Sequence, residues 1–161
     1  MTQIISDLLL AQERAMQEGN WIEPLIPLLR NVSAEQAYSK RSPDEHSIAE
    51  IVAHLAIWAE WAAGFLGGID VDVEEWPHIE PEIDDRWDLL RQRLVDSYAS
   101  LARATQYLSV EDLEVKPVPE VTQMTRLQAI LSITMHAAYH SGQIVKMVEA
   151  PVTTEGSGTL N

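Results

Sequence analysis

The feature that most constrains the fold of this chain is a long apolar stretch from Leu127 to Met147 that contains no proline. Its apolar residues recur at three- and four-residue spacing, which predicts a helix that buries one face. His136 and His140 lie four residues apart within it. A helix places both imidazoles one turn apart on the same face, within reach of one metal ion. The alternative is a pair of core histidines with hydrogen-bond partners, because burying unpaired imidazoles is unfavourable.

A second apolar stretch has a clear start. Ser47 is followed three residues later by Glu50, a spacing that forms a capping box at the first turn of a helix. The predicted helix continues to about Leu66 and stops at the glycine pair that follows it. His54 lies beside the inward stripe of this helix, with aromatic residues on its own face, and is therefore the third candidate ligand. The stripe itself is Ile48, Ile51, Val52, Leu55, Ala59, Ala62 and Leu66.

Two further helices are predicted, one before Ser47 and one between the two helices that carry histidines. The first covers about Ile4 to Met16 and is interrupted at Gly19-Asn20. After the interruption, a resumed helix would carry Trp21, Ile22, Leu25, Leu28 and Leu29 onto the core, with Pro24 and Pro27 predicting a kink or a break. The next helix starts near Asp84 and presents a seam at alternating three- and four-residue spacing: Trp87, Leu90, Leu94, Tyr98, Leu101, Thr105 and Leu108.

Capping signals and loop composition describe the remaining chain. Ser33 with Gln36, Ser109 with Asp112, and Thr125 with Gln128 have the spacing of helix or turn caps; the last pair starts the helix that carries His136 and His140 and ends before Pro151. Residues 67–85 form an acidic connection that is too long for a tight turn. We expect its charges to be solvated and His78, within it, to be exposed.

Charge and cysteine usage limit the possible functions. The formal net charge of -14 and the pI near 4.6 disfavour nucleic acid and anionic membrane surfaces as partners. The absence of cysteine excludes a disulfide or a thiolate ligand, so a metal site must use His, Asp or Glu. We find neither a signal peptide nor an apolar run long enough to span a bilayer, and we expect a cytoplasmic protein.

Four amphipathic helices with two long connections predict an all-α fold, a four-helix bundle. We expect one domain over residues 1–150 and a flexible tail over 151–161. If the second and fourth helices pack side by side, His54, His136 and His140 converge. Three protein ligands leave coordination positions open, as in catalytic zinc sites. A plain bundle with three core histidines is the less favoured reading.

Two segments resemble a known family. The capped sequence Ser-Ile-Ala-Glu-Ile-Val-Ala-His-Leu (Ser47 to Leu55) and the later His-Ala-Ala-Tyr-His-Ser-Gly-Gln-Ile (His136 to Ile144) resemble the DinB/YfiT-like superfamily of metal-binding four-helix bundles. The resemblance covers roughly residues 28–147 in order and spacing. It implies an up-down-down-up bundle, frequent homodimers, and a divalent metal ion, zinc or nickel, held by His54, His136 and His140.

The resemblance also implies a range of functions. Some members are S-transferases or isomerases that use low-molecular-weight thiols such as bacillithiol or mycothiol. The helix that carries the first ligand usually begins with a Trp-Ser pair, where this chain has His46-Ser47. His46 is therefore a possible residue of the site rim.

The predicted site supports a metal-dependent reaction. A divalent ion with open positions lowers the pKa of bound water toward ~7 and favours the thiolate of a cosubstrate, which gives either a hydrolase or a thiol S-transferase. Because the chain has no cysteine, the S-transferase reaction needs a thiol cosubstrate. Candidate acid-base or supporting residues are Tyr98, Tyr107, Tyr139 and Glu50. The competing hypothesis is a non-catalytic metal-binding or stress-related interaction protein.

Aromatic content and histidine chemistry give two more expectations. We expect some of the five tryptophans to lie at a homodimer surface; they are Trp21, Trp58, Trp61, Trp76 and Trp87. Each ligand histidine must be unprotonated to bind the ion, so metal affinity should fall as pH drops through ~6.5.

Overall fold

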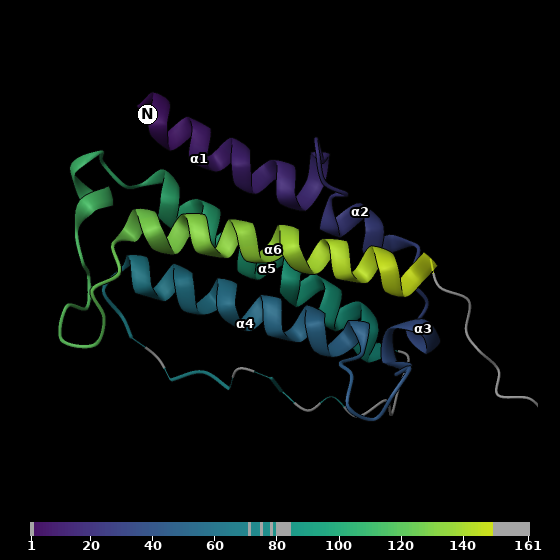
Figure 1. Ribbon diagram of the computed structural model, residues 1–161. Coiled ribbons are helices and arrows are strands. Elements are labelled where there is room, and N and C mark those ends of the chain that lie inside the picture. Colours follow the sequence, from purple (N-terminus) through teal and green to yellow (C-terminus); the bar gives the residue numbers. More distant parts are fainter. Residues whose placement is uncertain (1, 71, 75, 78, 80–84, 150–161) are drawn as a thin grey trace, which may run out of the picture.

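The computed structural model describes residues 2–70, 72–74, 76, 77, 79 and 85–149. Every regular element in this part of the chain is a helix, which confirms the all-α prediction (Figure 1). In chain order the elements are α1 Gln3–Glu13, the π-helix η1 Arg14–Glu18, α2 Leu25–Arg30, α3 Ala34–Tyr38, α4 Ile48–Leu66, α5 Asp85–Gln106, the 3-10 helix η2 Glu111–Glu114 and α6 Arg126–Glu149.

The helix α4 begins and ends where the sequence predicts. The Ser47 hydroxyl accepts a hydrogen bond from the Glu50 N–H (3.2 Å), and the Glu50 carboxylate accepts one from the Ser47 N–H (2.9 Å). Both members of the capping box are therefore present. At the other end, Gly68 has a φ of 82°, a left-handed conformation that glycine adopts without a side-chain clash. The predicted inward stripe is buried throughout.

The helix α6 begins at its predicted cap. The Gln128 N–H donates to the Thr125 hydroxyl (3.2 Å), and the Thr125 N–H donates to the Gln128 side chain (2.9 Å). Next to this cap, the guanidinium of Arg126 donates to the backbone carbonyl of Leu66, the last residue of α4 (2.7 Å). The start of α6 therefore lies beside the end of α4.

The opposite ends of the same two helices are also tied together. Arg41, which precedes α4, donates to the backbone carbonyls of Lys146 (2.8 Å) and Met147 (3.2 Å) near the end of α6. Last-turn carbonyls have no partner within their own helix, so this guanidinium satisfies them. With contacts at both ends, α4 and α6 run antiparallel side by side (Figure 1).

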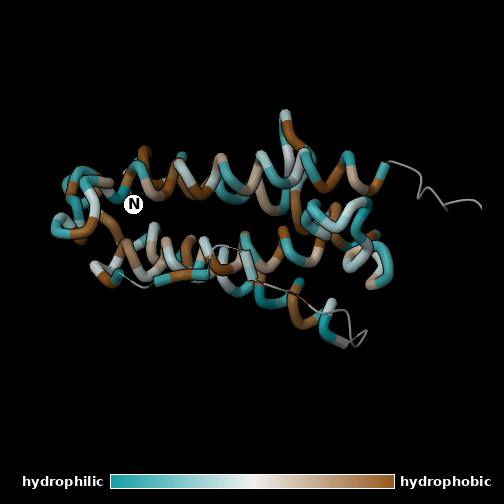
Figure 2. The backbone as a smooth tube through the Cα atoms, turned by 60° about the horizontal axis from the view of Figure 1, so that its bottom comes forward, coloured by the Kyte–Doolittle hydropathy of each residue, from teal (hydrophilic) through white to brown (hydrophobic). Residues whose placement is uncertain are grey.

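The long helices α1, α4, α5 and α6 enclose one core. The helix α4 contacts α5 and α6, and α1 contacts the same two helices. Apolar residues recur along these helices between polar ones (Figure 2). On α5, Trp87 is buried and its indole N–H donates to the Val32 carbonyl (2.9 Å). The largest fully buried side chains include Phe65, Leu94, Leu101, Ile130 and Ile144, and burying each contributes about 1.5–3 kcal/mol.

The segment after α1 differs from the prediction. The chain passes through the π-helix to Gly19, whose φ is 70°, and the next helix starts only at Leu25. Trp21 is 94% exposed and Ile22 is 37% exposed, so the expectation that these side chains reach the core is wrong. The glycine turn and Pro24 keep this short stretch out of a helix and direct it away from the core. Leu25 and Leu29, on the inner face of the next helix, are buried as predicted.

The apolar character of α4 exceeds the sequence-based expectation. By length and composition, Ile48–Leu66 is suited to cross a membrane, so the statement that no apolar run is long enough is wrong. However, 67% of the window is buried within the fold. Its apolar side chains are therefore covered by the other helices, as in the central helix of a helical core.

The two connections are partly described. The Ser109–Asp112 cap forms as predicted: each backbone N–H donates to the side chain of the other residue. In the acidic connection, the expected helix start at Asp84 and the exposed position of His78 lie outside the described residues, as does the tail at 151–161. The helix that follows the connection begins at Asp85.

Candidate metal centre

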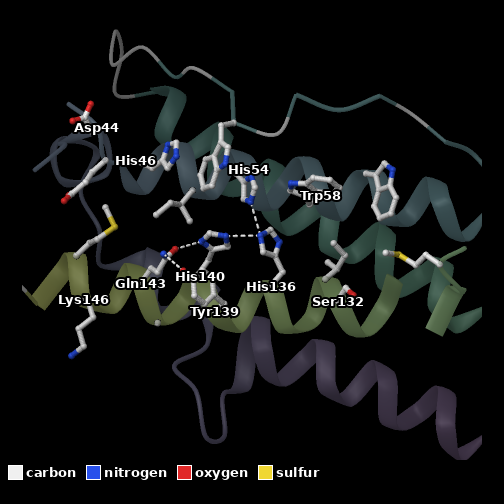
Figure 3. A pocket seen from close by; sticks show the side chains of 18 residues that line it. Asp44, His46, His54, Trp58, Ser132, His136, Tyr139, His140, Gln143 and Lys146 are labelled. Atoms are coloured by element: carbon white, nitrogen blue, oxygen red, sulfur yellow. Dashed lines mark hydrogen bonds between the residues drawn. The ribbon is translucent and has the colours of Figure 1, made fainter. Parts of the chain in front are cut away.

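Three histidines from two helices meet in the middle of the α4–α6 pair. The Nε2 atom of His136 lies 2.9 Å from Nε2 of His54 and 2.9 Å from Nε2 of His140 (Figure 3). One nitrogen from each ring lies within 4.8 Å of the other two. The structure therefore brings together all three predicted candidate ligands, one from α4 and two from α6.

The contacts at His136 fit a shared cation better than hydrogen bonds alone. A neutral imidazole nitrogen carries either one hydrogen or one lone pair, so it makes one hydrogen bond in the ring plane and not two. His140 must present a lone pair, because its Nδ1–H donates to the Gln143 amide oxygen (2.5 Å). Two nitrogens bound to one tetrahedral zinc ion at about 2.0–2.1 Å lie about 3.3–3.4 Å apart, so each 2.9 Å contact is about 0.4 Å shorter than that spacing. The chemistry of the donor set and the closeness of its nitrogens therefore fit a divalent ion after a small movement of the rings.

The imidazoles are held neutral by their surroundings. Burial, together with the neighbouring His140 and His54 rings, lowers the pKa of His136 from 6.5 to about 4. Burial also lowers the pKa of His140, although its hydrogen bond to Gln143 opposes the shift. A neutral imidazole is the form that binds a metal ion. At neutral pH these two rings are thus ready to act as ligands.

Gln143 orients His140, a role that was not predicted from the sequence. Its amide oxygen accepts from His140 Nδ1, and its amide nitrogen donates to the Tyr139 hydroxyl (3.0 Å). A partner on the far nitrogen fixes the tautomer and ring orientation of a ligand histidine. The three-residue spacing between His140 and Gln143 places both on one helix face, and that spacing was the available signal.

Trp76 packs against the ligand on α4 and was also missed. Its ring is stacked on His54 with centroids 3.9 Å apart and an angle of 6° between planes. The other face stacks on His46, with centroids 3.6 Å apart. Trp76 comes from the acidic connection, far from both rings in sequence, and no local pattern predicts this contact. The expectation for this connection concerned its charges and did not cover Trp76.

The triad opens into a cavity of about 1070 Å³ between α4 and α6. Such a volume is slightly above the usual range of about 300–1,000 Å³ for small-molecule sites. His46 lines it with a side chain that is 44% exposed, so it lies at the rim of the cavity and also packs on Trp76. An open cavity beside three ligands differs from a closed structural metal site, in which a fourth protein ligand completes the shell.

The comparisons with known proteins agree with this geometry. The model of the DinB superfamily matches residues 21–144. The chain belongs to the DinB superfamily. A crystal structure of a conserved protein from Enterococcus faecalis is similar to this DinB-superfamily chain, with a TM-score of 0.59 and 20% identity over 91% of this chain and 94% of that one. At this identity the likeness concerns the fold. No curated protein matches the chain.

The other candidate residues of this DinB-superfamily protein lie in different environments. Tyr139 lines the cavity. Tyr107 is 87% exposed at the end of α5, and Tyr98 is buried in the core, where burial raises the pKa of its hydroxyl. The structure therefore brings one of the three candidate tyrosines to the triad.

Glu50 stabilises the start of α4 and is not placed as a metal ligand. Its carboxylate binds the Lys40 ammonium (2.7 Å) in addition to the capped N–H of Ser47. Burial alone would raise the pKa of Glu50, but the hydrogen bonds from Lys40 and Ser47 and the Lys40 charge leave it below its usual value. The carboxylate thus stays ionised and engaged at the helix start.

Proposed function

We propose that this chain is a divalent-metal-binding protein in which His54, His136 and His140 hold one zinc or nickel ion. The observation that carries the proposal is the convergence of three Nε2 atoms, each from a separate ring, at the wall of an open cavity. Imidazole suits both metals, and supply decides between them. Three protein ligands leave positions for other molecules to reach the ion from the cavity.

We further propose a metal-dependent S-transferase or hydrolase. A divalent ion bound by neutral imidazoles supplies Lewis acidity, which lowers the pKa of water or of a thiol. The chain has no cysteine, so a transferase reaction takes its sulfur from a low-molecular-weight thiol. The cavity walls exclude part of the solvent, and Tyr139, held by the Gln143 amide, offers a hydroxyl near the triad for a proton or hydrogen bond.

The test combines metal analysis with turnover. The purified protein, loaded with zinc or nickel, is assayed with a panel of electrophiles in the presence and absence of a small thiol. Thiol-dependent turnover supports the transferase, and thiol-independent hydrolysis supports the hydrolase. One equivalent of metal without turnover favours the alternative, a non-catalytic metal-binding or stress-related interaction protein. Metal content unchanged in the triple His→Ala variant would refute the site itself.

The family also suggests the assembly and topology. We propose an up-down-down-up four-helix bundle that forms one domain and pairs as a homodimer in the cytoplasm. Exposed apolar side chains on α6, Leu131 (42%) and Met135 (68%), are suited to a subunit contact. We expect light scattering to give a dimer mass that Met135→Lys lowers. A monomer mass at every accessible concentration would contradict the dimer.

A further inference from the structure

The cavity extends in two directions from the triad, and its two ends differ in chemistry. Trp58 and Ser132 lie at one end, and Asp44, His46 and Lys146 lie at the other, with the three histidines between them (Figure 3). This division follows from the antiparallel helices. One end is formed by the end of α4 and the start of α6, and the other by the start of α4 and the end of α6.

We propose that the end with Trp58 and Trp61 is the subsite for a neutral aromatic group of the substrate, an assignment that rests on the function proposed above. We call this end the aromatic arm and define it by the cavity-lining residues Trp58, Trp61, Met124, Ser132 and Ile133.

The first argument is the rigidity of the aromatic wall. Trp58 and Trp61 meet edge to face with ring centroids 5.4 Å apart, and Trp61 stacks on the fully buried Phe65 with centroids 4.9 Å apart. Trp58 in turn approaches His54 edge to face, at 6.3 Å. The rings are thus fixed on one side by the core and half-buried, with their remaining surface facing the cavity. A preorganised aromatic wall binds a flat ring without the loss of its own side-chain freedom.

The second argument is charge. Among the described residues that line the cavity, the formally charged side chains Asp44, Glu45 and Lys146 come from the far end, beside the start of α4 and the end of α6. The aromatic arm offers only indole N–H groups and the Ser132 hydroxyl as polar partners. An ionised group placed there loses its hydration without gaining an opposite charge, which is strongly unfavourable. The net charge of -14 adds a repulsive potential for anions.

The third argument is continuity with the triad. Trp58 is one turn beyond His54 on α4, and Ser132 is one turn before His136 on α6. An aromatic group held between these two turns directs its substituent along the cavity toward the Nε2 atoms. The arm would therefore position the electrophilic atom of an aryl or benzyl compound beside the metal, while the far end receives the polar reactant.

The experiment compares two probes of nearly the same shape, neutral naphthamide and anionic naphthoate, by titration calorimetry on the zinc-loaded and the metal-free protein. We expect naphthamide to bind both forms, and naphthoate to bind the metal-free form at least about tenfold more weakly. Trp61→Ala should weaken naphthamide binding at least about tenfold. Trp21→Ala, which removes a 94% exposed ring away from the cavity lining, is the matched control and should leave it unchanged.

A second variant guards against a folding defect in Trp61→Ala. Ser132 is exposed and lines the arm, so Ser132→Phe should fill the arm, block naphthamide and retain one equivalent of zinc. Naphthamide binding that survives both variants, no naphthamide binding at all, or naphthoate binding of equal strength to the metal-free form would overturn the proposal. If the triad takes up no zinc while naphthamide still binds as expected, the proposed function fails and the aromatic arm stands.

Discussion

The two helices that carry the histidines support them in different ways. On α6, the orienting partner of His140 is Gln143, three residues away in the same helix. On α4, the ring of His54 is covered by Trp76, which comes from the connection beyond the helix and lies between His54 and His46. One support is local and directional, whereas the other is distant in sequence and acts through a ring face. This contrast predicts that changes on the α6 side affect the metal more than changes on the α4 side.

The largest effect should come from the ligands themselves, which set the reference for this comparison. Replacing His54, His136 or His140 by Ala should weaken zinc binding by more than about 100-fold, beyond the 10- to 100-fold typical of supporting residues. Elemental analysis and competition titration measure the loss. Losses that are large on α6 and small for His54 would show that the ion is held by α6 alone.

Acid should release the metal through the α6 side. The pKa of His136 lies near 4 in the folded protein, below its value of 6.5 in an unfolded chain, and that of His140 is lowered as well. In the folded protein, protons therefore compete with the metal mainly below pH 6.5, lower than the window expected from free histidine. The extra stability of the metal-loaded form should persist at pH 6.5 and vanish toward pH 4.

The same shifts predict the behaviour of the metal-free protein. The unfolded state binds protons more readily than the folded state between pH 6.5 and about 4, so folding stability is fully present above pH 6.5 and falls as pH drops through this range. Thermal melting of both forms from pH 8 to pH 4 measures the two effects. His136→Gln should flatten this part of the metal-free profile. An unchanged profile in that variant would contradict the depressed pKa.

Removal of the local support should have the next largest effect. Gln143→Leu removes the acceptor for His140 Nδ1–H and should weaken zinc binding about 10- to 100-fold. Gln143→Glu retains an acceptor at the same position and should bind zinc nearly as well as the wild type. Tyr139→Phe loses only the hydrogen bond to the Gln143 amide nitrogen and serves as the matched control. Equal zinc affinity of Gln143→Leu and Gln143→Glu would show that the hydrogen bond to His140 does not support metal binding.

Removal of the distant support should have the smallest effect. Aromatic pairs contribute about 0.5–1.5 kcal/mol beyond the burial of their area, so Trp76→Ala should weaken zinc binding about 2- to 10-fold, and Trp76→Phe less. Because Trp76 lies against His54, bound nickel should quench its fluorescence. Trp58, which lies edge to face with His54, should be quenched as well, so Trp76→Phe should lose part of the quenching and Trp21→Ala almost none. Undiminished quenching in Trp76→Phe would place the Trp76 ring elsewhere.

Local signals account for the parts of the fold that the sequence predicts well. The capping boxes at Ser47 and Thr125 form as expected, because each depends on residues three positions apart. The triad follows from the same kind of information: four-residue spacing orients His136 and His140, and apolar periodicity turns His54 inward. The remaining step, side-by-side packing of the two helices, was only a condition of the prediction, and the structure supplies it through the Arg41 and Arg126 contacts at the two ends of the pair.

Contacts between distant segments account for what the sequence does not predict. Trp21 and Trp76 are chemically alike and both lie outside helices, yet the first is 94% exposed and the second is sandwiched between two imidazoles. The difference depends on where each connection runs, which is set by the helices around it. The turn at Gly19 leads Trp21 away from the core, and no spacing in the sequence encodes where it ends.

The separation of the ligands along the chain has a consequence for biosynthesis. His54 and His136 are 82 residues apart, and a ribosome adds about 5–20 residues per second. Roughly 4 to 16 s therefore pass between the synthesis of the first ligand and the second. During this interval the apolar helix α4 has no α6 to cover it, and a single imidazole holds zinc or nickel only weakly. An ion that needs all three histidines can therefore bind only after α6 has been translated, and it cannot shield α4 before then.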